Sequence, residues 1–203
     1  SQFLFDYFTN KSLHFVRNSS PYYNGPIGQL IHQWLKDYFK TSTETFYLLQ
    51  SADKTHMQDF IKQCEAYGVD VLILIRYVHS QLAYGAYDND EEWLAFLARH
   101  LRMPDTVVYL DVEPEVSMHR TGKYGENDNY ESDVDRLRHT RNEYLALFAE
   151  HKEKGDLVTI ETIDANQTPF VVRAQLFKTA GRIYEQLVGS GTLTPEKQKE
   201  HDQ

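Results

Sequence analysis

Residues 71–84 read VLILIRYVHSQLAY, and the rest of the chain can be arranged around this stretch. The apolar run at 71–75 is too short for a membrane helix and rich in β-branched residues, which is typical of a strand buried on both faces of a parallel sheet. The run stops at Arg76. Because open α/β sheets bind ligands at the carboxyl ends of their strands, Arg76 is a candidate anion contact. The alternative is an arginine that caps the strand and pairs with a neighbouring carboxylate.

The composition fits one domain with a substantial core, because the chain has 203 residues of ordinary apolar content. No apolar run approaches the roughly 20 residues of a membrane span, so no membrane partner is expected. A net charge of −9 argues against a nucleic-acid partner, since such binders usually gather Lys and Arg on one face. Cys64 is the only cysteine, which predicts no internal disulfide and a reducing compartment, the cytoplasm. No histidine spacing predicts a metal site.

Hydrophobic patterning predicts strands alternating with helices, which indicates βα units and a mostly parallel sheet of the α/β class. Strands are expected at 13–17, 71–75, 106–112 and 157–163. Helices are expected at 1–10, 27–39, 42–67, 91–101, from 113 onward, at 130–150 and at 169–187. Residues 121–129 are glycine-bearing and polar, so they are expected to form a mobile loop, and 188–203 are expected to form a polar tail.

Five segments, taken in order, carry a common pattern. They are Arg17 with GPIG at 25–28, LLQSADK at 48–54, RYVHSQLAY at 76–84, PDTVVYLDVEPE at 104–115, and NYE at 129–131 with Arg136. In this order and spacing they resemble the segments of the thymidylate kinase family, P-loop enzymes that move the γ-phosphate of ATP to dTMP. The resemblance implies a three-layer P-loop kinase fold, with one domain over 1–187 and a lid around 119–131.

The resemblance also implies ligands and partners. ATP would be the phosphate donor, dTMP or a related deoxynucleotide the acceptor, and Mg²⁺ would be held through phosphates and water. A homodimer packed through helices is implied as well, with 44–67 as a candidate face.

Phosphoryl transfer depends on positioning negative charge, so arginines are the expected machinery. By resemblance, Arg76 would hold the dTMP phosphate and contact the transferring group, with Arg17 assisting from its loop. The lid would contribute Arg120 and Lys123, whose charges reach the ATP phosphates when the lid closes. Arg120 has an alternative interpretation as a solvated helix residue.

The resemblance also places residues of two segments, 48–54 and 76–84, at the nucleoside. The resemblance places Ser80 and Gln81 at the nucleoside and the ring of Tyr84 beneath the deoxyribose, where it would exclude a 2′-hydroxyl. Tyr84 has an alternative role in core packing. The family's base-stacking phenylalanine corresponds to Gln50, and its base-reading arginine to Lys54, which has fewer fixed donors. A replacement ring for stacking would come from a tyrosine at 22, 23 or 47, and the sequence leaves that choice open.

Two departures from the family pattern bear on catalysis. Nothing in the sequence matches the phosphate-cradling loop G-x-x-x-x-G-K-[ST], which lies between the family's first strand and first helix. Since that strand is central to the sheet, we expect the functional protein to have residues before Ser1 that supply it. The aspartate that precedes the motif arginine is Ile75, whose side chain can neither bind a metal-coordinated water nor accept a hydrogen bond.

The sequence therefore leaves two classes of function open. The first is an Mg-dependent kinase that forms dTDP from dTMP, or a kinase for a modified pyrimidine deoxynucleotide. The second is a catalytically silenced nucleotide-binding protein of the same ancestry, which the isoleucine at 75 favours. A deoxynucleoside kinase is a more distant option, because the segment at 104–115 argues against it.

Overall fold

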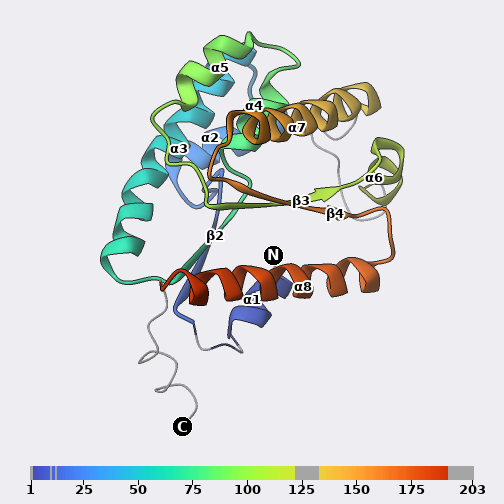
Figure 1. Cartoon of the computed structure of the whole chain (residues 1–203). Coiled ribbons are helices and arrows are strands. Elements are labelled where there is room, and N and C mark those ends of the chain that lie inside the picture. The colour runs from blue at the N-terminus through green and yellow to red at the C-terminus, as the bar shows by residue number, and fades with distance from the viewer. Residues whose placement is uncertain (1, 10, 12, 122–132, 192–203) are drawn as a thin grey trace.

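The computed structural model describes residues 2–9, 11, 13–121 and 133–191 (Figure 1). Helices and strands alternate along the chain, as the sequence predicts. The helices are α1 (Gln2–Thr9), α2 (Pro26–Leu35), α3 (Thr43–Ala66), α4 (Val78–Gly85), α5 (Glu91–Ala98), α6 (Pro114–Thr121), α7 (Val134–Lys154) and α8 (Pro169–Gly189). The strands are β1 (Phe15–Ser19), β2 (Val71–Ile75), β3 (Thr106–Asp111) and β4 (Thr159–Asp164).

The strands form two parallel pairs, β1 with β2 and β3 with β4. In the first pair Ser19 lies opposite Ile75, and in the second Asp111 lies opposite Asp164, so each pair ends in register at its carboxyl edge. Within the described ranges β2 does not pair with β3, and the predicted sheet is therefore divided into two pairs. The further strand expected in its middle stays a prediction.

Helices cover the strands on two sides (Figure 1). On one side α1 packs against β1 and α8 against β4, and the two helices contact each other, with the rings of Tyr7 and Phe177 5.9 Å apart. On the other side lie α4, α5 and α7, with α4 packed between α3 and α7. This three-layer α/β arrangement confirms the predicted fold class.

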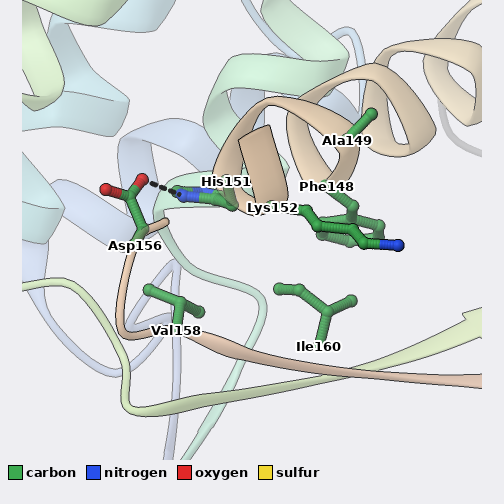
Figure 2. A pocket seen from close by; sticks show the side chains of 7 residues that line it. All are labelled: Phe148, Ala149, His151, Lys152, Asp156, Val158 and Ile160. Carbon is green, nitrogen blue, oxygen red and sulfur yellow. Dashed lines mark hydrogen bonds and ion pairs between the residues drawn. The ribbon is translucent and has the colours of Figure 1, made fainter. Parts of the chain in front are cut away.

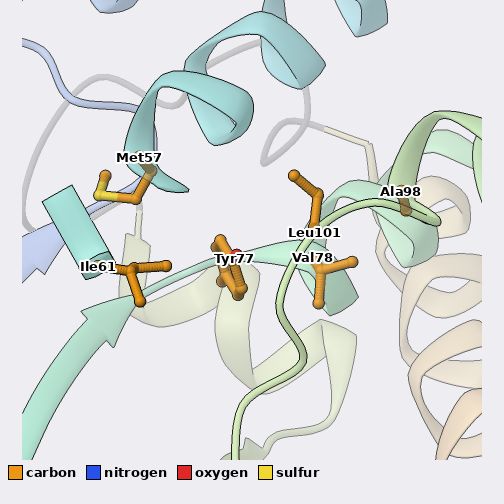
Figure 3. Close-up of a cluster of buried hydrophobic side chains, with 6 residues drawn as sticks. All are labelled: Met57, Ile61, Tyr77, Val78, Ala98 and Leu101. Atoms are coloured by element: carbon orange, nitrogen blue, oxygen red, sulfur yellow. The ribbon is translucent and has the colours of Figure 1, made fainter. Parts of the chain in front are cut away.

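The hydrophobic core centres on α3, α4 and α5. One buried cluster contains Met57, Ile61, Tyr77, Val78, Ala98 and Leu101 (Figure 3). A second contains Ile31, Phe46, Tyr47 and Leu94. Each large apolar side chain that is fully buried stabilises the folded protein by about 1.5–3 kcal/mol. Tyr77 and Val78, which follow the end of β2, belong to the first cluster. The core therefore fixes the position of the chain where β2 ends. None of the described helices is apolar over a length that would cross a bilayer.

The prediction of a strand buried on both faces is wrong for β2, whose residues are all half-buried. The physical reason is that β2 has one strand neighbour among the described residues, so one of its edges stays partly open. Strand β1 likewise has one strand neighbour among the described residues, and its residues are half-buried except the exposed Arg17. No helix was expected at 78–85, where α4 forms. Its polar residues His79 and Gln81 are buried, which hides the amphipathic pattern that would predict a helix.

Helix boundaries follow their capping residues. Helix α3 begins where predicted, because the Ser42 hydroxyl accepts a hydrogen bond from the Thr45 amide. Helix α7 begins four residues later than predicted, at the cap formed by Asp133, and ends at Gly155, whose φ is +68°. Helix α2 ends at Leu35 rather than at 39.

Candidate functional site

Arg76 follows β2 directly and lies at the carboxyl end of the strand, as predicted. Its backbone φ is +60°, a left-handed conformation that costs a non-glycine residue about 1–3 kcal/mol. This conformation turns the chain sharply from β2 into α4. The guanidinium carbon of Arg76 lies 5.1 Å from the ring centroid of Tyr84, within the range of a cation–π contact. The turn and the ring together hold an exposed cation at the strand end.

Helix α4 carries the residues that the sequence places at the nucleoside. The Tyr144 hydroxyl of α7 donates a 2.7 Å hydrogen bond to Ser80 Oγ. Gln81 is only 3% exposed and faces α3, where its Nε2 donates to Ser51 Oγ at 2.7 Å. Its Oε1 has no hydrogen-bond partner within the structure. Ser80 and Tyr84 therefore share the α7 side of α4, whereas Gln81 points toward α3.

Helix α3 brings a buried cation to the same place. Lys54 is 2% exposed, and its Nζ donates a 3.0 Å hydrogen bond to Gln50 Oε1. Burial lowers the pKa of Lys54 to about 8, while Asp53 acts to raise that pKa and Arg76 to lower it. Because its positive charge lowers the pKa of Lys54, Arg76, the predicted phosphate contact, lies within electrostatic range of Lys54, a predicted base contact.

Asp53 anchors the loop between β1 and α2, a role that the sequence analysis did not assign. Its carboxylate accepts hydrogen bonds from Ser20 Oγ at 3.0 Å and from the Tyr22 amide at 2.9 Å, and the side chain is 3% exposed. The loop also passes very close to Gly28 of α2. A Cβ at this position would lie 2.0 Å from the Tyr22 carbonyl oxygen, so only glycine fits there. The loop is thus fixed against α3 beside Lys54.

Arg17 does not lie where the sequence analysis expected. Strand β1 runs to Ser19, two residues past the predicted end, so Arg17 is an exposed strand residue opposite Ile73. It is not part of the loop that Asp53 fixes. The assisting role that the resemblance gave to Arg17 stays a prediction.

Arg120 holds another loop. Its guanidinium donates to the carbonyl oxygens of Ala165, Asn166 and Gln167, at 2.5, 3.0 and 3.1 Å, in the segment that follows β4. Arg120 is thus an exposed helix residue that also holds a loop, and a contact with ATP phosphates would require these bonds to be exchanged. Lys123 and the predicted lid from residue 122 onward lie outside the described residues.

Carboxylates near the strand ends are already engaged. Asp111, at the end of β3, accepts two hydrogen bonds from Arg141, at 2.6 and 3.0 Å. In the part of the chain that the structure describes, no three His, Cys, Asp or Glu side chains gather as a metal site. Ile75 occupies the last position of β2, where its backbone oxygen accepts from the Ser20 amide at 3.0 Å. These residues offer no ready carboxylate set to a protein-held Mg²⁺.

A histidine pair joins α4 to the end of α7, and nothing in the sequence signals it. His79 Nε2 lies 3.0 Å from His151 Nε2, and His151 Nδ1 lies 2.7 Å from Asp156 Oδ2. Burial and, as a smaller effect, His151 together lower the pKa of His79 to about 4. Figure 2 shows His151 and Asp156 at the wall of a pocket of about 510 Å³. The pocket is also lined by Phe148, Ala149, Lys152, Val158 and Ile160.

Known proteins match this chain over most of its length. A family model described as "Thymidylate kinase" matches residues 1–174. A thymidylate kinase of Caenorhabditis elegans is 36% identical over 112 residues, which cover 55% of this chain and 50% of that protein. A thymidylate kinase of Schizosaccharomyces pombe is 30% identical over 151 residues, 74% of this chain and 69% of that protein. A probable thymidylate kinase of Pyrobaculum aerophilum is 30% identical over 163 residues, 79% of this chain and 80% of that protein. The match thus spans half the length of the nematode relative.

Proposed function

The chain belongs to the thymidylate kinase family, and we propose on this basis that it transfers the γ-phosphate of ATP to dTMP, forming dTDP, in an Mg²⁺-dependent reaction. Enzymes of this family are phosphotransferases that use ATP. The observation that carries the proposal is the place of Arg76, which presents an exposed guanidinium at the carboxyl end of a parallel strand.

Arg76 suits the phosphate of a nucleoside monophosphate. A guanidinium can bind two phosphate oxygens at once, and it retains its charge as that phosphate attacks. The chemistry of phosphoryl transfer asks the protein chiefly to align groups and to stabilise negative charge. We propose that Arg76 does both for the acceptor, with the Tyr84 ring fixing the direction of the guanidinium.

Lys54 and Gln50 supply the proposed base contacts. The Gln50 side-chain oxygen is used by Lys54, so its amide nitrogen keeps donors for a base. The Lys54 ammonium also only donates. Together they suit a base edge that presents acceptor oxygens, as the carbonyls of a pyrimidine do. A modified pyrimidine deoxynucleotide is the variant of this function that the pairing of Lys54 with Gln50 favours.

The phosphate donor of the proposed reaction is ATP with its Mg²⁺. The described residues do not fit a protein-held Mg²⁺, because Ile75 stands at the end of β2 and the Asp111 carboxylate is engaged by Arg141. The proposed reaction therefore uses no Mg²⁺ that these residues hold directly. Mg²⁺ that arrives on ATP would be held by phosphates and water.

The second candidate function is nucleotide binding without turnover, and Ile75 favours it. The experiment compares the full-length protein with Ile75→Asp and with the conservative Ile75→Val. Each is mixed with ATP, Mg²⁺ and dTMP, and ADP release is measured alongside calorimetric binding of dTMP. We expect the unchanged protein to release ADP. Binding without ADP, with turnover restored only by Ile75→Asp, would instead establish a silenced kinase. A protein that neither binds dTMP nor releases ADP would contradict both functions.

We also propose a homodimer that packs through α3, as the resemblance implies. Leu48 projects from this helix and is 51% exposed, which suits a contact between subunits. Leu48→Glu should shift the sedimentation coefficient from dimer to monomer. A Leu48→Glu protein that sediments as the unchanged protein does would place the interface elsewhere.

A further inference from the structure

Tyr144, on α7, makes two contacts with α4. Its hydroxyl donates to Ser80 Oγ at 2.7 Å, and its ring lies 6.3 Å from the ring of Tyr84 at an interplanar angle of 88°. Residues four apart on a helix lie on the same face, so Ser80 and Tyr84 present themselves together to α7. One side chain of α7 therefore contacts both Ser80, expected at the nucleoside, and Tyr84, expected beneath the deoxyribose.

Tyr144 is itself firmly held. The ring of Tyr109, on β3, lies 4.9 Å away and that of Phe148, one helical turn along α7, lies 5.9 Å away. Burial raises the pKa of Tyr144, so its hydroxyl stays protonated and remains a donor. A buried hydroxyl without a partner is costly, and Ser80 provides that partner.

The contacts continue to the strand end. The Tyr84 ring meets Tyr144 edge to face, and it meets the Arg76 guanidinium at 5.1 Å. An aromatic pair of this geometry is worth more than the area that it buries, because the ring edge and the ring face carry opposite partial charges. Tyr84 is therefore constrained by a ring from α7 and by the arginine at the end of β2.

We propose that Tyr144 is a positioning residue that sets the preference of this site for deoxyribose over ribose acceptors. The inference rests on the proposed function and on the place beneath the deoxyribose that the family resemblance implies for the Tyr84 ring. A ring excludes a 2′-hydroxyl only if it cannot shift aside to make room for it. Tyr144 opposes that shift, directly through its ring and indirectly through Ser80.

Two variants separate the ring from the hydroxyl. Tyr144→Phe keeps the edge-to-face contact and removes the hydrogen bond to Ser80, whereas Tyr144→Leu removes both. Phe177→Leu, on α8, is the control, because it removes an aromatic ring that contacts Tyr7 and leaves Tyr144 with its neighbouring rings in place. Thermal melting of each variant of the full-length protein verifies that it is folded.

The measurement is the ratio of two dissociation constants, for ribothymidine 5′-monophosphate and for dTMP, by calorimetry. We expect dTMP to bind more tightly in the unchanged protein. The ratio should fall about threefold in Tyr144→Phe and at least about tenfold in Tyr144→Leu, and it should not change in Phe177→Leu. A ratio that stays unchanged in both Tyr144 variants, or that falls equally in Phe177→Leu, would overturn the inference while leaving the proposed function intact. An unchanged protein that binds neither nucleotide would overturn the proposed function and this inference with it.

Discussion

The guanidinium of Arg76 lies over the ring of Tyr84, with its central carbon 5.1 Å from the ring centroid. The two residues come from different elements, since Arg76 follows β2 and Tyr84 lies in the last turn of α4. Their contact joins the proposed phosphate site to the proposed sugar site. An exposed arginine held in this way is arranged in advance for its ligand, which lowers the entropy cost of binding.

Arg76→Ala should lower kcat/KM for dTMP by about a hundredfold or more, because a group that stabilises transition-state charge is lost. Arg99→Ala is the matched control. Arg99 also lies over a ring, that of Phe96 at 4.1 Å, but it caps the carboxyl end of α5 rather than following β2. Steady-state ADP release measures both variants. Equal kcat/KM values for the two would remove Arg76 from the site.

Lys54 should give acceptor binding a pH dependence near its pKa of about 8. Below this pH the amine is charged and donates strongly, and above it the charge is lost, so the KM for dTMP should rise between pH 7 and 9. Lys54→Arg keeps its charge throughout this range, because a guanidinium pKa exceeds about 12. The variant should therefore show a flatter profile of KM against pH. Parallel profiles would show that Lys54 does not contact the acceptor.

Asp53→Ala should lower the free energy of unfolding by about 1–3 kcal/mol, since the Ser20 hydroxyl and the Tyr22 amide lose their acceptor. Asp59→Ala, on the same helix, is the control. Asp59 pairs with Lys62 at 3.8 Å, and both side chains are more than 70% exposed, so this pair contributes little. Urea denaturation measures both changes. A similar loss in the two variants would argue against Asp53 as the anchor of the loop.

Gly85→Ala should destabilise the protein by about 1–3 kcal/mol through overpacking. A Cβ at this position would lie 2.8 Å from a Leu94 methyl carbon and 3.0 Å from the Tyr47 ring. Gly189→Ala provides the contrast, because nothing lies within 4 Å of the added carbon at the end of α8. Melting temperatures should fall for the first variant and not for the second. A loss confined to Gly189→Ala would contradict the packing of α4 on α5.

His79 should make the protein less stable in mild acid. Its pKa is about 4 in the folded state, against about 6.5 when unfolded. Between these values the unfolded chain takes up a proton that the folded chain does not, so the free energy of unfolding is largest above pH 6.5. It falls as the pH drops toward 4, by up to about 3 kcal/mol.

His79→Gln should flatten this dependence of stability on pH, because glutamine does not titrate. His56→Gln, at an exposed position of α3, should leave the dependence unchanged. Urea denaturation at several pH values between 4 and 7 gives the comparison. A His79→Gln protein that loses as much stability in acid as the unchanged protein would assign the effect to other groups.

The elements with strong local signals were predictable. Helix α3 has its serine cap and its apolar spacing in the sequence, and β2 is a plain apolar run that ends at Arg76. Helix α4 was not predictable in the same way. Its polar residues are satisfied by partners far along the chain, as Gln81 is by Ser51, and periodicity does not record such partners.

The same limit applies to the site. Arg76, Tyr84 and Lys54 are site residues predicted from motif resemblance. Arg76 contacts Tyr84 and lowers the pKa of Lys54, while their roles stay predictions. Tyr144 was not identified, because its role follows from the rotation of α7 against α4, which tertiary packing sets. The strand pattern placed Arg17 at the end of a strand over 13–17, and only the resemblance placed it in a loop. Strand β1 runs on to Ser19, and strand ends are the least certain feature of a pattern.

The most direct test of the central claim is ADP release by the full-length protein supplied with ATP, Mg²⁺ and dTMP. Our account predicts ADP and dTDP in equal amounts, at a rate far above that without dTMP, and a loss of both products in Arg76→Ala. ADP formation that is the same with and without dTMP, from a folded preparation, would contradict the account.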